Sequence, residues 1–478
     1  MDKIPQKFDH TVPVPGLVSL AKPPFAEPGP VVADRNSLAQ QDPRRDAFWY
    51  RRSFNLPGSV PPVATLKVGK AMFGTRVILN GQLIGDHLPS FTPGLFDLRA
   101  ALRPGKNELL IRVGAARDSL PPSIPNGFDY EKTRYIPGIF DSVDLILSGT
   151  PDIVNLQVAP DLPNQSARVQ TLLHNAGEQA VATVVFTVRE AKSLKLITTL
   201  TNAQILLAKG ADQTVSVLIP MPGFRPWSPE DPFLYQIEAD TGQDRFETRF
   251  GMRSFQFDTK TRIALLNGKP YFMRGSNITL YRFFEDPECG ALPWDKNWVR
   301  LLHRRVKDMH WNCLRYCIGF PPEAWYRIAD EEGILVQDEF PIWYGGAGWS
   351  KWPANSKVMN SSPNMQNGCA NAGIIPLWLF GMPATRLPPP KPVSLSKKCA
   401  AWICRTGPGT TAMECRAFLE MFSNLIPTTF MTPNISWLTW PRKMVFPKAM
   451  PCPIRAIHLP LSMNTVGCGS TATARPRP

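Results

Sequence analysis

Three polar side chains occupy related places in three expected parallel strands. Asn277 follows the first strand, Arg315 lies within the second and Glu339 ends the third. Their residue types leave two interpretations open. In the structural one, Asn277 is a turn residue and Arg315 is the ion-pair partner of Asp338 or Glu339. In the functional one, these side chains contact a ligand.

Cysteines and glycines near the C-terminal third suggest two other kinds of site. Cys399, Cys404 and Cys415 carry thiols that could bind zinc, but their spacing matches no common ligand pair. Gly345-Gly346-Ala347-Gly348 is not followed by the Lys-Ser/Thr pair or the capped helix of a phosphate-binding loop. We therefore identify no metal site and no cofactor from the sequence.

The basic charge of the chain is confined to its C-terminal part. The whole chain carries 53 − 39 = +14 formal charges, whereas residues 1–352 hold 40 basic and 37 acidic side chains and residues 353–478 hold 13 and 2. A nucleic-acid partner would rest on this tail alone, and we expect none. No apolar run of about 18 residues and no secretory segment is visible, so we expect no membrane association and a cytoplasmic location.

The first 252 residues show short strand signals separated by turn residues, which is typical of β-sandwiches. Asn80-Gly81 lies between two apolar runs and favours a two-residue hairpin. The expected strands include residues 48–54, 77–79, 109–113, 170–174, 182–188 and 214–219. We predict one sandwich over residues 1–148 and a second, smaller one over residues 149–252.

From residue 253 onward, strands alternate with helices. The expected strands are residues 271–275, 313–317 and 334–337, after a hairpin at Asn267-Gly268. A helix capped by Asp295 separates the first two strands, and a helix from Pro322 to Gly333 separates the last two. This order predicts a parallel α/β unit of about three strands over residues 253–352.

Several motifs, taken in order, match one family. They are Trp49-Tyr50-Arg51-Arg52, Leu79-Asn80-Gly81, Pro137-Gly138-Ile139-Phe140, Trp227 to Pro232, Phe250-Gly251-Met252-Arg253, Arg274-Gly275-Ser276-Asn277, Asn312 to Arg315 and Gly333 to Glu339. The series resembles glycoside hydrolase family 2, which contains β-galactosidases, β-glucuronidases and β-mannosidases. The resemblance spans nearly all of residues 45–345. It implies a jelly-roll sugar-binding sandwich, an immunoglobulin-like sandwich and a (β/α)₈ TIM barrel.

The resemblance also implies an active site at the carboxyl ends of the barrel strands. There, two glutamates about 5 Å apart would cleave a β-glycoside with retention. Asn277, Arg315 and Glu339 correspond to substrate-binding positions. Ile278-Thr279-Leu280 stands where the family often has a histidine, and Tyr316 to Pro321 replaces a Ser-His-Tyr-Pro continuation, so the substrate class stays open. Some relatives use Mg²⁺, for which no ligand set is visible here, and the intact parent could be a homo-oligomer.

Neither catalytic glutamate of the family is present in the written sequence. No Asn-Glu pair follows a strand, and the only acidic residues after Pro353 are Glu414 and Glu420. The tail also lacks a persistent helical or strand period. These features are explained if residues 353–478 are coding sequence translated out of frame, because an offset frame loses the codons of Asp and Glu.

One offset frame restores family motifs. Each new codon takes the last base of one written codon and the first two bases of the next. Met365 to Leu387 then reads as a segment that ends in Val-Val-Ile-Trp-Asp-Ala-x-Asn-Glu-Thr, which places the acid/base glutamate in register with Arg386. Met463 to Ser470 reads as Asn-Glu-Tyr-Gly-Trp-Leu-Trp-Leu, which places the nucleophile in register with Asn464. The 464 − 386 = 78 positions between them suit strands about three barrel units apart.

The sequence thus predicts a family 2 parent enzyme that hydrolyses terminal β-glycosides, with β-galactosides as the first choice of carbohydrate substrate. It predicts that this chain is catalytically inactive, with a truncated barrel over residues 253–352 and a disordered tail over residues 353–478. The alternative is a non-catalytic carbohydrate-binding protein, which would bind a glycan without turning it over.

Overall fold

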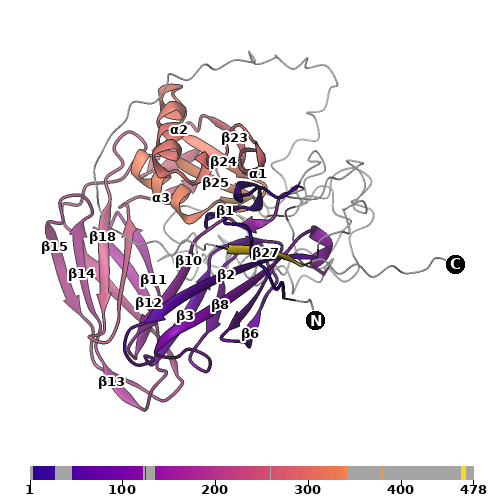
Figure 1. Ribbon diagram of the computed structural model, residues 1–478. Coiled ribbons are helices and arrows are strands. Elements are labelled where there is room, and N and C mark those ends of the chain that lie inside the picture. The colour runs from indigo at the N-terminus through magenta and orange to yellow at the C-terminus, as the bar shows by residue number, and fades with distance from the viewer. Residues whose placement is uncertain are drawn as a thin grey trace, which may run out of the picture.

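A computed structural model describes residues 4–26, 46–121, 124, 127, 135–258, 260–339 and 341, with the backbone of two short strands at residues 378–380 and 465–469. Figure 1 shows three bodies: an indigo to purple β-sandwich, a magenta to pink β-sandwich and an orange α/β layer. The predictions for Gly345 to Gly348, the tail cysteines, Arg386 and Asn464 lie outside the described residues. So does the disorder predicted for the tail, apart from the two short strands.

The first sandwich contains ten strands and two 3₁₀ turns of the described chain. They are β1 Gly16–Leu17, η1 Val18–Leu20, β2 Ala47–Leu56, β3 Val63–Val68, β4 Ala71–Met72, β5 Thr75–Leu79, β6 Gln82–His87, β7 Gly94–Asp97, β8 Gly105–Gly114, η2 Arg117–Ser119, β9 Gly138–Ile139 and β10 Val143–Ser148. Its sheets have the strand orders β27-β2-β8-β5-β6, in which β27 is Thr465–Gly469, β10-β3-β7 and β1-β9-β4. The predicted hairpin at Asn80-Gly81 is confirmed, since both residues have positive φ, as this turn requires.

The second sandwich is built from nine strands. They are β11 Asp152–Asp161, β12 Ser166–His174, β13 Ala180–Ala182, β14 Val185–Glu190, β15 Leu196–Thr201, β16 Ile205–Leu207, β17 Asp212–Pro220, β18 Tyr235–Asp240 and β19 Arg245–Phe250. The sheets β11-β12-β17 and β15-β14-β18-β19 face each other, and β13 pairs with β16. Alternate residues of β12 and β18 are buried, so each strand contributes one face to the core.

The third body begins with a small antiparallel sheet and continues as a parallel one. Its elements are β20 Phe255–Phe257, β21 Ala264–Leu266, β22 Lys269–Pro270, β23 Gly275–Thr279, α1 Leu280–Glu285, η3 Leu292–Trp294, α2 Lys296–Asp308, β24 Cys313–Cys317, α3 Glu323–Glu332, β25 Leu335–Glu339 and β26 Trp378–Phe380. The parallel strands lie in the order β23-β24-β25-β26. Asp295 caps α2 and Gly333 ends α3 at φ 74°, so both predicted helices are confirmed.

The first parallel strand lies four residues later than predicted. We expected it at residues 271–275, whereas β23 starts at Gly275, so Asn277 is inside the strand rather than after it. The apolar run that suggested the earlier position points largely outward, since Phe272 is 77% exposed. The short helix α1 was not predicted.

Two strands come from the segment for which no regular structure was predicted. β26 pairs in parallel with β25, from Gln337↔Trp378 to Glu339↔Phe380. β27 Thr465–Gly469 pairs antiparallel with β2. The parallel sheet therefore has a fourth strand, at the positions where the offset frame reads Val-Val-Ile.

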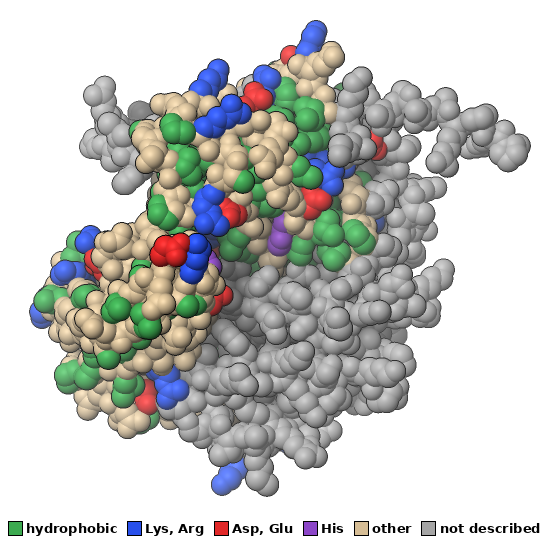
Figure 2. Space-filling view, turned by 90° about the horizontal axis from the view of Figure 1, so that it is seen from below, with side chains coloured by type: hydrophobic (Ala, Val, Ile, Leu, Met, Phe, Trp, Pro, Cys, Tyr) green, Lys and Arg blue, Asp and Glu red, His purple; other side chains and the backbone are tan. Residues whose placement is uncertain are grey.

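The first sandwich and the α/β layer share one hydrophobic core. Val77 and Ile111 of the sandwich belong to the same buried cluster as Leu314 and Trp325 of the α/β layer. The second sandwich has a core of its own around Phe186. Within the described part of the chain, no helix is both long and apolar enough to cross a bilayer. On the face in Figure 2, basic and acidic side chains of the described residues lie beside one another.

Candidate functional site

The three predicted site residues meet on one face of the parallel sheet. Asn277 of β23 lies opposite Arg315 of β24, which lies opposite Gln337 of β25. Arg315 Nη1 donates to Asn277 Oδ1 at 3.2 Å, and its Nη2 lies 2.8 Å from Glu339 Oε1. The guanidinium therefore bridges an amide on one neighbouring strand and a carboxylate on the other.

This arrangement decides which carboxylate pairs with Arg315. The partner is Glu339, whose side chain is 7% exposed, whereas Asp338 points to the opposite face of the strand. Asn277 is exposed, and the Arg315 side chain keeps 29% of its surface accessible. The structural interpretation of Arg315 as an ion-pair partner thus holds, and its exposed edge can still donate to a ligand. Whether a sugar is that ligand stays a prediction.

Close backbone approach fixes the register of β23 on β24. A Cβ atom at Gly275 would lie 1.8 Å from the carbonyl oxygen of Cys313, so only glycine fits there. Just before β24, the buried Asn312 accepts from the Arg274 amide at 2.9 Å and donates to the Phe272 carbonyl at 3.0 Å. These contacts align Asn277 with Arg315.

A buried acid that was not predicted from the sequence lies on the other face of β25. Asp338 is fully buried and its Oδ2 accepts from Tyr326 Oη at 2.8 Å, whereas its Oδ1 has no hydrogen-bond partner among the described residues. Burial raises the pKa of Asp338 to about 7, against the lowering effects of the Tyr326 hydroxyl and of Lys70. Nothing in the sequence Gln337-Asp338-Glu339 indicates which of the two acids pairs with Arg315 and which is buried against Tyr326.

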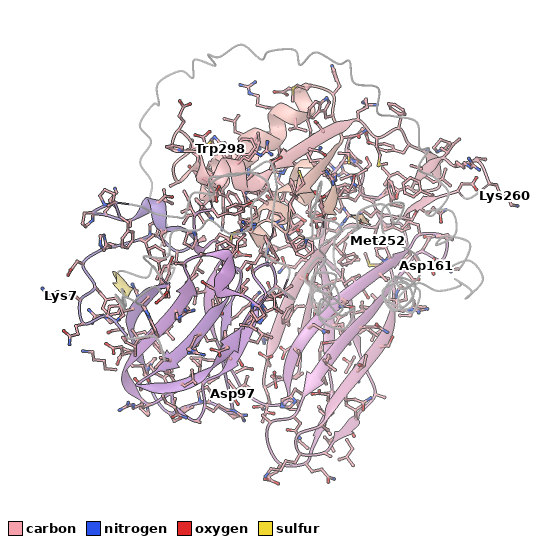
Figure 3. All side chains as sticks on the ribbon, turned by 90° about the vertical axis from the view of Figure 1, so that its right-hand side faces the viewer. Lys7, Asp97, Asp161, Met252, Lys260 and Trp298 are labelled. Carbon is pink, nitrogen blue, oxygen red and sulfur yellow. The ribbon has the colours of Figure 1, made fainter. Side chains whose placement is uncertain are left out.

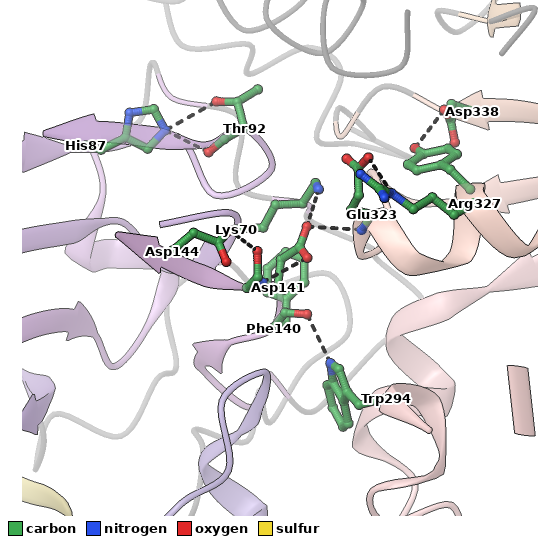
Figure 4. A network of polar contacts seen from close by, with 12 residues as sticks. Lys70, His87, Thr92, Phe140, Asp141, Asp144, Trp294, Glu323, Arg327 and Asp338 are labelled. Carbon is green, nitrogen blue, oxygen red and sulfur yellow. Dashed lines mark hydrogen bonds and ion pairs between the residues drawn. The ribbon is translucent and has the colours of Figure 1, made fainter. Parts of the chain in front are cut away.

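A carboxylate of the first sandwich caps the helix behind the site (Figure 4). Asp141 Oδ2 accepts from the backbone amide of Glu323, the first residue of α3, at 3.2 Å and from Lys70 Nζ at 2.5 Å. The helix has no side-chain cap of its own, because Pro322 occupies that position. Nearby, Trp294 Nε1 donates to a backbone carbonyl of the first sandwich at 3.0 Å.

An aromatic ring from the first sandwich packs against the loop that follows β24. Phe91 is 3% exposed, and Cβ atoms placed on Gly127 or Gly319 would lie within 2.5 Å of its ring atoms. The Phe91 ring also meets those of Phe140 and Tyr281, at centroid distances of 6.1 and 5.6 Å. The loop after β24 is therefore held by the first sandwich, a contact between segments far apart in sequence.

The second sandwich contacts the same helix near its C-terminal end. Trp227 is fully buried and its Nε1 donates to the carbonyl oxygen of Asp330 in α3 at 2.9 Å. Arg253 lies over the Trp227 ring at 4.3 Å and pairs with the Asp330 carboxylate at 3.4 Å. Figure 3 shows the helix layer that carries Trp298 above both sandwiches, with Asp97 at the distant end of the first one.

Other possible sites are weaker. The described residues include no group of three His, Cys, Asp or Glu side chains placed to hold a metal ion. An open groove of about 610 Å³ lies between the two sandwiches, lined by residues such as Ser148, Gln243 and Asp244. It contains none of the three predicted site residues.

Sequence comparisons agree with this architecture. The family model described as "Glycosyl hydrolases family 2" matches residues 152–253, which contain the second sandwich. A putative β-glucuronidase of Formosa agariphila is 26% identical over 361 residues, which cover 71% of this chain and 40% of the relative. A β-galactosidase of Enterobacter cloacae is 30% identical over 285 residues, which cover 55% of this chain and 25% of the relative. The chain thus spans less than half the length of these relatives.

Solved structures share the fold. A β-galacturonidase from Eisenbergiella tayi bound to galacturonate matches with a TM-score of 0.64 at 19% identity, over 85% of this chain and 68% of that one. A β-glucuronidase of Bacteroides uniformis matches with a TM-score of 0.60 at 20% identity, over 80% of this chain and 48% of that one. Because the family model and the curated relatives point to the same family, and the solved structures share its fold, the chain belongs to glycoside hydrolase family 2.

Proposed function

We propose that the parent of this chain is an exo-acting, retaining β-glycosidase and that the written chain keeps part of its sugar site without its catalytic groups. The observation that carries the proposal is the bridge from Asn277 through Arg315 to Glu339, across three parallel strands of a family 2 chain. Polar side chains near the carboxyl ends of such strands are where barrel enzymes bind their substrates.

The charge at this place favours a neutral sugar over a uronic acid. The relatives include proteins named for glucuronides and for galactosides. A uronate carboxylate is best held by a cation without another anionic partner, whereas Arg315 is already paired with Glu339 at 2.8 Å. Terminal β-galactosides are therefore the first substrate proposed for the parent.

Catalytic inactivity of the written chain follows from the residues at the two family positions. Retention requires one carboxyl group that gives and takes a proton and one that attacks the sugar. Arg386 stays protonated at all relevant pH values, and the amide of Asn464 does not ionise. Neither side chain can perform these steps.

The proposal is tested by assaying two chains on p-nitrophenyl β-galactoside and p-nitrophenyl β-glucuronide. The first is the written chain, and the second has the same gene with its frame restored after about codon 352. We expect no hydrolysis by the first and hydrolysis with retained anomeric configuration by the second, faster on the galactoside. A restored chain with glutamine at position 386 is the matched control. Turnover by the written chain, or none by the restored one, would contradict the proposal.

Glycan binding without turnover is the second candidate for the written chain itself. It is favoured by the exposure of Asn277 and of the Arg315 side chain, which leaves their polar atoms accessible to sugar hydroxyls. Titration calorimetry with galactose should detect binding that is lost in Arg315→Gln. The control is Arg99→Gln, because Arg99 forms a similar ion pair with Asp97 on the first sandwich. Equal binding by both variants would rule this site out.

A further inference from the structure

A second polar cluster lies behind the candidate site, on the face of β24 and β25 that packs against the helices. Its members are His303 of α2, Tyr316 of β24, Tyr326 of α3 and Asp338 of β25, all at most 7% exposed. Each strand of the cluster also carries a site residue at the adjacent position, Arg315 or Glu339. Because successive residues of a strand point to opposite faces, the cluster and the site lie back to back.

The hydrogen bonds of His303 fix its protonation. Its Nδ1 lies 2.7 Å from the Val299 carbonyl, which can only accept, so Nδ1 carries the hydrogen. Burial lowers the pKa of His303, which keeps the ring neutral. Its Nε2 therefore accepts from the Tyr316 hydroxyl at 2.6 Å, and this bond ties β24 to α2.

Asp338 ties β25 to α3 in a different way. Tyr326 Oη donates to Asp338 Oδ2, but within the described part of the chain no group donates to Oδ1. A fully buried carboxyl group with a single donor is more stable neutral than ionised. Other groups around it are the phenol of Tyr316, which stays neutral because burial raises its pKa, and the ammonium of Lys70. The latter is already paired with Asp141 at 2.5 Å.

We propose that His303, Tyr316, Tyr326 and Asp338 form a pH-sensitive clamp that holds β24 and β25 against α2 and α3. With Asp338 neutral the clamp is tight and fixes Arg315 and Glu339 in their bridging positions. Opening of the clamp lets Asp338 ionise in water, so rising pH favours the open state. These residues are positioning residues, because none of them contacts the face that carries the site.

The direction of the pH effect follows from linkage. The pKa of Asp338 is about 7 in the folded chain and near 3.8 when the group is exposed. The stability that neutral Asp338 gives to the closed clamp is therefore fully present below about pH 4 and is lost as the pH rises toward 7. Above that pH, the group is ionised in both states and the equilibrium no longer depends on pH. Over the middle of this range, the equilibrium constant for opening should rise about tenfold per pH unit.

Amide hydrogen exchange of the full chain, followed by mass spectrometry from pH 5 to pH 8, tests this proposal. After correction for intrinsic exchange, peptides covering residues 313–317 and 335–339 should lose about tenfold protection between pH 5 and pH 6 and level off above pH 7. In Asp338→Asn the protection should be independent of pH over this range. Asp97→Asn, which changes an exposed carboxylate on the first sandwich, should behave as wild type. An identical profile in wild type and Asp338→Asn would overturn the proposal.

A second variant keeps the test decisive if Asp338→Asn does not fold. Tyr326→Phe removes the hydroxyl that lowers the pKa of Asp338, so the pH at which protection levels off should move upward. An unchanged or lower levelling pH would overturn the proposal. No sugar is present in these measurements, so their outcome is independent of the glycosidase proposal.

Discussion

Arg315 is the residue on which the candidate site depends, because its guanidinium joins three strands. Its planar fork contacts the Asn277 amide with one nitrogen and the Glu339 carboxylate with another. A lysine ammonium is a single point of charge and cannot reproduce both contacts in the same geometry. The site is therefore sensitive to the shape of this side chain as well as to its charge.

Replacing Arg315 should destabilise the chain more than replacing an exposed arginine. Arg315→Gln removes the cation next to Glu339, whose side chain is 7% exposed, and we expect a loss of about 1–3 kcal/mol in the free energy of unfolding. Arg99→Gln, at a solvent-exposed pair, should cost less than about 1 kcal/mol. Urea unfolding of both variants makes the comparison. Equal losses would mean that the Arg315–Glu339 pair is not a structural bridge.

At the scale of elements, helix α3 depends on the first sandwich for its N-terminal cap. Asp141 accepts from the first amide of the helix and from the buried Lys70. Removing one partner of a buried ion pair leaves the other as an uncompensated charge. The Asp141 carboxylate thus links the first sandwich to α3, while Lys70 of the same sandwich compensates its charge.

We expect Asp141→Ala to lower the free energy of unfolding by about 3–5 kcal/mol, since it removes the cap and leaves Lys70 unpaired. Glu323→Gln changes a carboxylate in an exposed pair with Arg327 and should cost no more than about 0.5 kcal/mol. Thermal unfolding followed by circular dichroism measures both. A loss below 1 kcal/mol in Asp141→Ala would show that this contact is dispensable.

Elements with local signals were predictable from the sequence, and elements set by distant contacts were not. Gly333 ends α3 and Asn80-Gly81 turns a hairpin because positive φ is a property of those few residues. The start of β23 depends on the fit of Gly275 against Cys313, which lies 313 − 275 = 38 positions later in the chain, and no local pattern records this contact. The three candidate site residues were chosen from their family positions, whereas the burial of Asp338 was not predicted because it depends on α3.

At the scale of the whole molecule, the first sandwich is packed as part of the α/β layer. Their buried residues form one cluster, with Phe91 and Phe140 of the sandwich against Tyr281 and Phe284 of α1. A fragment of residues 1–255 would contain both predicted sandwiches but not the α/β layer. The shared core means that such a fragment exposes these aromatic faces to water.

A fragment of residues 1–255 should therefore melt on the order of 10 °C below a fragment of residues 1–341. Burial of several aromatic rings contributes about 1.5–3 kcal/mol each, and a domain of this size shifts by about 2–4 °C per kcal/mol. The shorter fragment should also bind a hydrophobic dye. Equal melting temperatures without dye binding would show that the sandwiches are stable alone.

The inactivity proposed for this chain depends on a family 2 gene that continues in another frame after about codon 352. The most direct measurement is the nucleotide sequence of codons 345 to 470, determined from independent DNA. We expect the offset frame to encode Asn-Glu at positions 385 and 386 and a further glutamate at position 464. Codons incompatible with those glutamates would contradict the account and leave this chain as a family 2 protein without a catalytic parent.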